Sequence, residues 1–234
     1  MRIDKFLSHA GLGTRTEVKK IIRREEVTVN DKPITSDGFN IDENNDVIKV
    51  NGEIIEYKEF HYVLLNKKEG YISATEDDKY STVIDLVEEY RVFDIFPVGR
   101  LDIDTTGLLL LTNNGKLAHV LLSPKHHVDK EYEVEVNYPL KEELINEFKN
   151  GVVIDNEYQC LPAILNIKDE YHCNVIIHEG KFHQVKKMFQ TFGYTVMRLN
   201  RIRMDFLTLD TIPNPGDYRE LTKDEITKLI SYIK

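Results

Sequence analysis

The chain has 234 residues, of which 41% are hydrophobic, and this is enough for a small domain beside a larger one with its own core. Its net charge of -9 argues against a uniformly basic nucleic-acid binder. Its two cysteines are too few for a disulfide framework or a four-cysteine zinc site. The opening MRIDKF lacks a signal-peptide core, and no run of about 18 apolar residues occurs, so we expect a cytoplasmic protein that contacts no membrane.

The beginning of the chain has the pattern of two short helices and a small sheet. Apolar residues with helical spacing begin at Ile3, and Thr14 starts a capping-box sequence before a second helix. Asn51-Gly52 separates two strand-like segments and is a strong hairpin signal. We therefore predict a compact α+β module over residues 1–56, followed by a linker over residues 57–60.

Residues 61–234 also follow an α+β pattern, and we expect a mixed, mainly antiparallel sheet flanked by helices. Four strands are predicted, at Tyr62–Leu65, Leu108–Leu111, Glu131–Val136 and Tyr171–Ile177. The four consecutive leucines of the second predict a fully buried strand. Helices are predicted from Leu144 to Gly151, from Val185 to Gly193 and from Thr222 to Ile233.

Basic residues gather in two regions of this acidic chain, and residues 25–60 are strongly acidic. Two such regions fit a protein that contacts phosphates along defined tracks, although each alone fits a solvated helix face equally well. The first region contains Arg2, Lys5, Arg15, Lys19, Lys20, Arg23 and Arg24, and the second contains Lys181, Lys186, Lys187, Arg198, Arg201 and Arg203.

The segment Val98–Gly107 places an arginine, two acids and two threonines directly before the buried leucine strand. Loops held by a rigid element are where functional sites are commonly built. By residue type alone, Asp102 could be a catalytic carboxylate or the cap of a turn. Asp102 and Asp104 could also share a divalent metal, but no histidine or carboxylate cluster nearby completes a cation shell, and we predict no metal.

The sequence GRLDIDTTGLLLLT at residues 99–112 resembles the signature of pseudouridine synthases of the small-ribosomal-subunit family, the RsuA type. SPKHHVDKEY at 123–132 and EGKFHQVKKMF at 179–189 resemble the second and third motifs of that family. The opening, RIDKFLSHAG followed by TRTEVKKIIRREEVTVND, resembles an S4 RNA-binding domain. The resemblance covers nearly the whole chain. One departure is at residues 66–70, where NKKEG replaces the usual Asn-Lys-Pro-x-Gly, so the turn loses a proline and gains a charge.

The resemblance implies a role for each site residue. Asp102 is the expected nucleophile, Lys186 its ion-pair partner, Tyr132 the surface that stacks on the target base, and Arg100 the side chain that fills the gap left by the flipped base. Asp104 and Thr105 are expected as structural or RNA-contacting positions. By residue type alone, Lys186 could equally contact phosphate and Tyr132 could be a core aromatic. The positions expected to bind RNA are Arg2, Lys5, Arg15, Lys19, Lys20, Arg23, Lys181, His183, Gln184 and Lys187.

The resemblance also implies the reaction, an isomerisation of uridine to pseudouridine in rRNA after the base is flipped out. This reaction needs no redox change and no outside atom, so no cofactor is expected. The sequence also lacks a glycine-rich loop of the kind that binds phosphates, so nucleotide triphosphate use is not expected. The implied substrate is 16S rRNA, at the position 516 uridine, on a precursor or assembling small subunit. The alternatives are a 23S rRNA synthase of the same family, a non-catalytic S4-type rRNA-binding protein and a metal-dependent phosphoryl or glycosyl enzyme. A monomer is expected, because no unpaired apolar helix face or coiled-coil seam is apparent.

Overall fold

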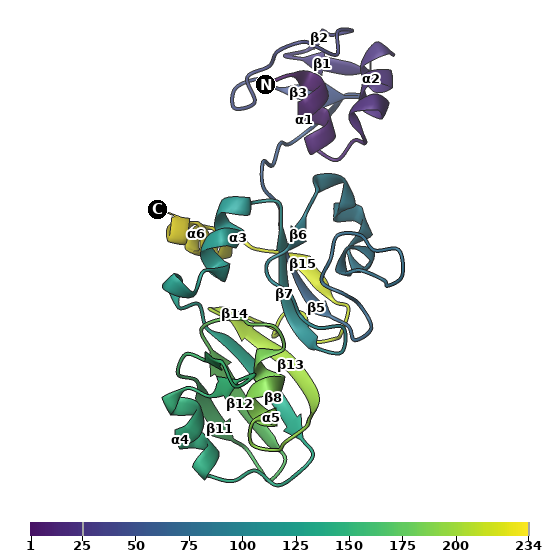
Figure 1. The fold of residues 1–234 in the computed structure, drawn as a ribbon. Coiled ribbons are helices and arrows are strands. Elements are labelled where there is room, and N and C mark those ends of the chain that lie inside the picture. The colour runs from purple at the N-terminus through teal and green to yellow at the C-terminus, as the bar shows by residue number, and fades with distance from the viewer. Residues whose placement is uncertain (25, 234) are drawn as a thin grey trace. The chain divides into compact units, whose positions relative to one another are not determined.

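The structure, a computed structural model, describes residues 1–24 and 26–233, and the chain divides into two compact units (Figure 1). The first unit is Met1–His61 together with Glu88–Ile95, and the second is Tyr62–Val87 together with the chain from Phe96 onwards. Within the described ranges, no helix is long and apolar enough to cross a membrane.

The first unit packs two helices on a four-stranded antiparallel sheet of order β2-β1-β3-β4. Its elements are α1 (Ile3–His9), α2 (Arg15–Arg23), β1 (Val27–Val29), β2 (Lys32–Pro33), β3 (Ile48–Val50), β4 (Glu53–Ile54) and the 3-10 helix η2 (Glu88–Phe93). The predicted capping box is present, because the Thr14 hydroxyl accepts from the Glu17 amide at 3.3 Å and the Glu17 carboxylate accepts from the Thr14 amide at 2.8 Å. The apolar faces of both helices are buried against the sheet, which leaves the basic side chains of α2 on the outer surface.

The second unit is built on a nine-stranded mixed sheet, as predicted, with a main order of β11-β12-β8-β13-β7-β5-β15 (Figure 1). Its strands are β5 (Tyr62–Lys67), β6 (Phe96–Pro97), β7 (Thr106–Thr112), β8 (Lys130–Val136), β11 (Ile164–Ile167), β12 (His172–Ile177), β13 (Val196–Met204), β14 (Leu207–Thr208) and β15 (Tyr218–Glu220). A separate hairpin pairs β9 (Val153–Ile154) with β10 (Tyr158–Gln159). The pairing of β13 with β7 is parallel, while the other neighbours on the main path pair antiparallel.

Helices and short 3-10 turns flank this sheet. They are α3 (Gly115–Leu122), α4 (Glu143–Asn150), α5 (Gln184–Gln190), α6 (Lys223–Ile230), η1 (Val83–Leu86), η3 (Pro124–His126) and η4 (Ser231–Ile233). The leucines of β7 are fully buried, as predicted, and two of them share a core with α3 and α6. The last helix is shorter than expected, since α6 ends at Ile230 and the chain continues as a 3-10 turn.

Gly107 allows β7 to approach β13 closely, where it pairs with Arg201. Its φ of +103° is a conformation that other residues rarely adopt, and a Cβ at this position would collide with the backbone of Arg201. The chain therefore enters β7 at a fixed point, and the polar segment just before it is held at the edge of a buried strand.

Candidate active site

The loop before β7, which carries Asp102, is held by hydrogen bonds on both sides. The Ser73 hydroxyl accepts from the Leu101 amide and donates to the Leu101 carbonyl oxygen, each at 2.9 Å. The buried ammonium group of Lys67 donates to the carbonyl oxygens of Ile103 at 3.3 Å and Thr105 at 2.7 Å. The backbone of this loop is therefore held by hydrogen bonds on both sides, although the turn at residues 66–70 lacks the family's proline.

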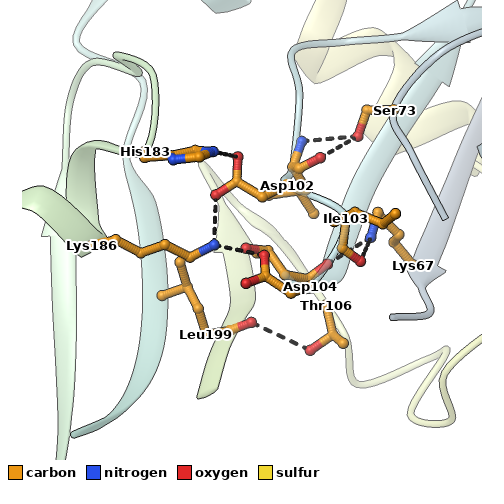
Figure 2. A network of polar contacts seen from close by, with 11 residues as sticks. Lys67, Ser73, Asp102, Ile103, Asp104, Thr106, His183, Lys186 and Leu199 are labelled. Carbon is orange, nitrogen blue, oxygen red and sulfur yellow. Dashed lines mark hydrogen bonds and ion pairs between the residues drawn. The ribbon is translucent and has the colours of Figure 1, made fainter. Parts of the chain in front are cut away.

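Asp102 lies in an ion-pair network with Asp104, His183 and Lys186 (Figure 2). The Lys186 ammonium is 2.9 Å from Oδ2 of Asp102 and 2.6 Å from Oδ1 of Asp104. His183 Nε2 is 3.4 Å from the other oxygen of Asp102. The side chains of Asp102 and Lys186 are only 25% and 23% exposed, so this pair is partly shielded from solvent.

The ion pair between Lys186 and Asp104 shifts the pKa of both groups. Partial burial raises the pKa of Asp104, but the hydrogen bond and charge of Lys186 outweigh that effect and leave this pKa below its ordinary value. Burial likewise lowers the pKa of Lys186, and the hydrogen bonds to Asp104 and Asp102 outweigh it, so the lysine pKa is raised. The lysine stays protonated and favours the ionised form of Asp104.

A cavity of about 110 Å³ opens beside Asp102. Tyr132, a buried residue of β8, lines it together with the exposed Arg100. Asp102 contributes the only carboxylate among the described residues that line this cavity, while Lys130, Lys181 and Arg201 contribute positive charge. The lining thus combines one carboxylate, one aromatic ring and several cations, which suits a negatively charged ligand that carries a planar base.

Several cations of the second basic region are buried or paired with acids, although the sequence suggests a row of side chains free to contact phosphates. Arg201 is buried, and its Nε donates to the Leu108 carbonyl oxygen at 2.7 Å. Arg203 is paired with Glu131 at 2.8 Å and Lys187 with Asp155 at 2.6 Å. Gln184 was expected to contact RNA, but it is buried. Its amide donates to Glu179 at 3.0 Å and accepts from the Lys181 backbone at 2.9 Å. Acids from other segments pair with two cations of this region, and Lys181 and Arg198 remain exposed.

The first basic region is more accessible. Arg15, Lys20 and Arg23 are exposed on α2 or at its ends. Lys19 lies 3.4 Å from Asp37, and Arg2 is hydrogen-bonded to the buried Asp4 at 2.9 Å. The exposed cations of α2 can therefore meet a phosphate backbone without first breaking an internal ion pair.

Comparison with known proteins decides the family. A family model described as RNA pseudouridylate synthase matches residues 61–191, and an S4 domain model matches residues 1–47. The chain belongs to the RNA pseudouridylate synthase family. This synthase is an RNA-modifying isomerase with an S4 domain at its N-terminus, which confirms the predicted family and fold class.

Relatives of the synthase match over nearly their whole length. The chain is 37% identical to ribosomal small subunit pseudouridine synthase A of Vibrio cholerae, with 98% of this chain and 99% of that protein covered. For the Escherichia coli protein of the same name, the identity is 35%, with coverage of 98% and 100%. An RNA pseudouridine synthase of Bacillus subtilis, YtzG, is 44% identical, with 97% of each chain covered. A crystal structure of a pseudouridylate synthase is 35% identical, covers 98% of this chain and 99% of that one, and superposes with a TM-score of 0.69.

Several residues that build the site of this synthase were not recognised as site residues from the sequence. Lys67 ends a strand whose six residues are all buried, Ser73 lies in an irregular segment, and Lys130 lies inside the cavity wall. Burial, reinforced by the charge of Arg201, lowers the pKa of Lys130 to about 8. The one available signal was a lysine that continues the apolar run YVLLNK, since lysines are almost never buried without partners.

The Asp102-x-Asp104 spacing is bridged by a lysine. Across residues 1–24 and 26–233, no group of three or more His, Cys, Asp or Glu side chains has the arrangement of a metal site. The two carboxylates are instead satisfied by the Lys186 ammonium. Thr105 is buried in the same loop and is one of the residues that line the cavity.

Proposed function

We propose that this synthase isomerises a uridine of small-subunit rRNA, with Asp102 as the nucleophile. The observation that carries the proposal is the position of Asp102, the one lining carboxylate of the described cavity, held by Lys186 and facing the same space as Tyr132. The relatives from Vibrio cholerae and Escherichia coli, which are named small subunit synthases, support the choice of RNA. The uridine at position 516 of 16S rRNA, in a precursor or assembling subunit, is the proposed target.

The chemistry assigned to Asp102 follows from its surroundings. Its carboxylate adds covalently to the flipped nucleoside, the bond from N1 to C1′ breaks, and the uracil turns within the cavity. A bond then forms from C5 to C1′, and the covalent bond to Asp102 breaks and returns the free carboxylate. The C5 proton is released and N1 gains a proton, so the atoms balance without a co-reactant. Lys186 and His183 contact the two carboxylate oxygens and hold the side chain in place.

The RNA reaches the cavity through contacts around its rim. Tyr132 stacks on the uracil, and Arg100 takes the space that the flipped nucleotide leaves in the RNA. In this proposal the S4 domain spans residues 1–56, the catalytic domain follows a linker at 57–60, and the protein acts as a cytoplasmic monomer. Arg15, Lys20 and Arg23 contact further phosphates of the same RNA.

The test is release of tritium to water from rRNA labelled at C5 of uridine, with 16S and 23S rRNA compared as free RNA and in precursor subunits. Wild-type protein should release label from 16S rRNA, and sequencing of that RNA should place one pseudouridine at position 516. Release from 23S rRNA alone would replace the substrate by the large-subunit alternative. Loss of activity in a strong chelator would favour the metal-dependent enzyme.

The substitution Asp102→Asn tests whether Asp102, and no neighbouring group, is the nucleophile. The change is nearly isosteric, so turnover should be lost while RNA affinity, which depends mostly on phosphate contacts, is kept. Asp210→Asn is the matched control, because Asp210 is exposed, accepts a hydrogen bond from the nearby Thr208 hydroxyl and does not line the cavity. Turnover of Asp102→Asn near the wild-type level would show that another group attacks the nucleoside. Binding of rRNA without turnover by the wild type would favour the non-catalytic alternative.

A further inference from the structure

Phe182 lies between β12 and α5, directly between two residues that line the cavity, Lys181 and His183. It is 70% exposed, whereas Phe148 and Phe189 in the same unit are fully buried. The ring therefore adds little to the hydrophobic core. Single exposed apolar side chains are common, so exposure alone assigns it no role.

The ring is also held in a defined orientation. It stacks on the His183 imidazole with ring centroids 3.8 Å apart and an interplanar angle of 20°. His183 has a left-handed φ of 53° and contacts Asp102 at 3.4 Å, so the stacked pair connects an exposed aromatic to the reactive carboxylate. The Lys187 ammonium lies 5.2 Å from the centre of the Phe182 ring. These contacts leave most of the Phe182 surface open.

The surroundings of Phe182 match a nucleotide better than a protein partner. A docking surface for a protein requires a contiguous apolar patch, but the sequence neighbours of Phe182 and the groups stacked around it are Lys181, His183 and Lys187. An aromatic face beside ammonium groups is the arrangement that binds unpaired bases next to their phosphates. Lys187 can turn to a phosphate because its partner Asp155 is 57% exposed, and exposed ion pairs are weak.

We propose that Phe182 stacks on the base of a nucleotide adjacent to the target uridine, with Lys181 and Lys187 on the phosphates beside it. The inference rests on the proposed function, since it needs a uridine flipped into the cavity beside Asp102. Flipping removes a stacking partner from both neighbouring bases. Arg100 takes the vacated space inside the RNA, and Phe182, at the rim of the cavity, stacks on a neighbouring base and holds it outside while the uridine is inside.

The experiment compares Phe182→Leu, which keeps an apolar side chain but removes the aromatic face, with Phe182→Tyr, which keeps the face. With C5-tritiated 16S rRNA, Phe182→Leu should raise KM roughly 5- to 150-fold, the range for one stacked base, and Phe182→Tyr should restore it. The value of kcat should change less than about twofold, because the contact is made equally in the ground and transition states. The matched control is Tyr138→Leu, an aromatic that is 61% exposed and does not line the cavity.

A second measurement uses the RNA instead of the protein. Once the modified uridine is mapped, an abasic nucleotide is placed in turn on its 5′ and 3′ sides. At one of these positions, the abasic nucleotide should raise KM of the wild-type protein as much as Phe182→Leu raises KM for intact RNA. The two changes together should raise KM no more than either change alone. An unchanged KM in Phe182→Leu, or losses that multiply, would overturn the inference. Absence of tritium release by wild-type protein from any rRNA would instead overturn the proposed function.

Discussion

The ammonium group of Lys67 donates a 2.7 Å hydrogen bond to the carbonyl oxygen of Thr105 from a side chain with no exposed surface. The same group reaches the carbonyl oxygens of Lys68 and Ile103 at 3.0 Å and 3.3 Å. Three backbone acceptors thus share one buried cation, and two of them lie in the loop that carries Asp102. The position of the proposed nucleophile depends on a lysine that does not line its cavity.

Replacing Lys67 by methionine should therefore reduce catalysis without touching the substrate. Methionine fills a similar volume but cannot donate, so the loop at residues 101–105 loses its anchor. We expect kcat for tritium release to fall about tenfold or more, since small displacements of reacting groups have large effects on rate. Lys68→Met is the control, because the Lys68 side chain is exposed. A Lys67→Met enzyme with wild-type kcat would show that Ser73 and the backbone suffice to hold the loop.

Lys67 should also make stability depend on pH in an unusual direction. Burial lowers its pKa from 10.5 to about 8, partly offset by the charges of Asp104 and Asp102. A lysine whose pKa is lower in the folded than in the unfolded state opposes folding while it is protonated. Stability therefore rises with pH from about 8 to 10.5. Between pH 7 and pH 10, the wild type should gain about 2 kcal/mol of unfolding free energy relative to Lys67→Met in urea titrations. A constant difference across this range would contradict the effect.

The effect of Lys186→Gln should be measured as a change in the pKa of Asp104, because the lysine lowers that pKa in the wild type. Without the ammonium group, the pKa of Asp104 should rise toward or above its ordinary value, because burial and the neighbouring Asp102 charge remain. Carboxyl carbon NMR titration measures this directly. The stability that the pair contributes is lost as pH falls through the folded pKa of Asp104, so the mutant should unfold less steeply with acid. An unchanged Asp104 titration would mean that the ion pair is not formed in solution.

Glu179 is the buried carboxylate that holds the turn before α5. It accepts from the Tyr158 hydroxyl at 2.7 Å, the Leu161 amide at 2.8 Å and the Gln184 amide at 3.0 Å. Glu179→Ala leaves these donors without their acceptor and should lower the free energy of unfolding by about 3 kcal/mol. The exposed Glu157, in the turn between β9 and β10, is the control, and Glu157→Ala should cost less than about 0.5 kcal/mol. Equal effects of the two substitutions would contradict this role.

The exposed arginines of α2 should set the salt dependence of RNA binding. Arg15→Gln with Arg23→Gln removes two positive charges from the exposed surface of the helix. The slope of log K against log salt concentration should become shallower by about 1 to 2, the contribution of two phosphate contacts. Lys223→Gln, in the exposed first turn of α6, should leave the slope unchanged. A double variant with the wild-type slope would remove α2 from the binding surface.

Elements that local chemistry specifies were predictable from the sequence. The capping boxes that begin with Thr14 and Thr222 are present, because the donor and acceptor lie only three residues apart. The leucine run of β7 is buried as expected, since four apolar residues in succession leave no face for solvent. The proximity of Asp102 and Lys186 followed from the family resemblance, whereas residue spacing alone left it open.

The strand β13 was not predictable in the same way. Its arginines read as an exposed basic region, but Arg203 is opposite Glu131 of β8 and Arg201 lies in the buried interior. Such pairs depend on the register between strands that are distant in the sequence, and nothing local encodes that register. Lys67 was missed for the same reason, because the acceptor of its shortest hydrogen bond comes from another segment.

The parallel pairing of β7 with β13 joins Thr106 to Asn200, which are 94 residues apart in the chain. During synthesis, residues 200 and 201 must emerge before β7 gains this neighbour, and β15 must follow before β5 is covered on its other side. We therefore expect no active site in a nascent chain from which β13 has not yet emerged.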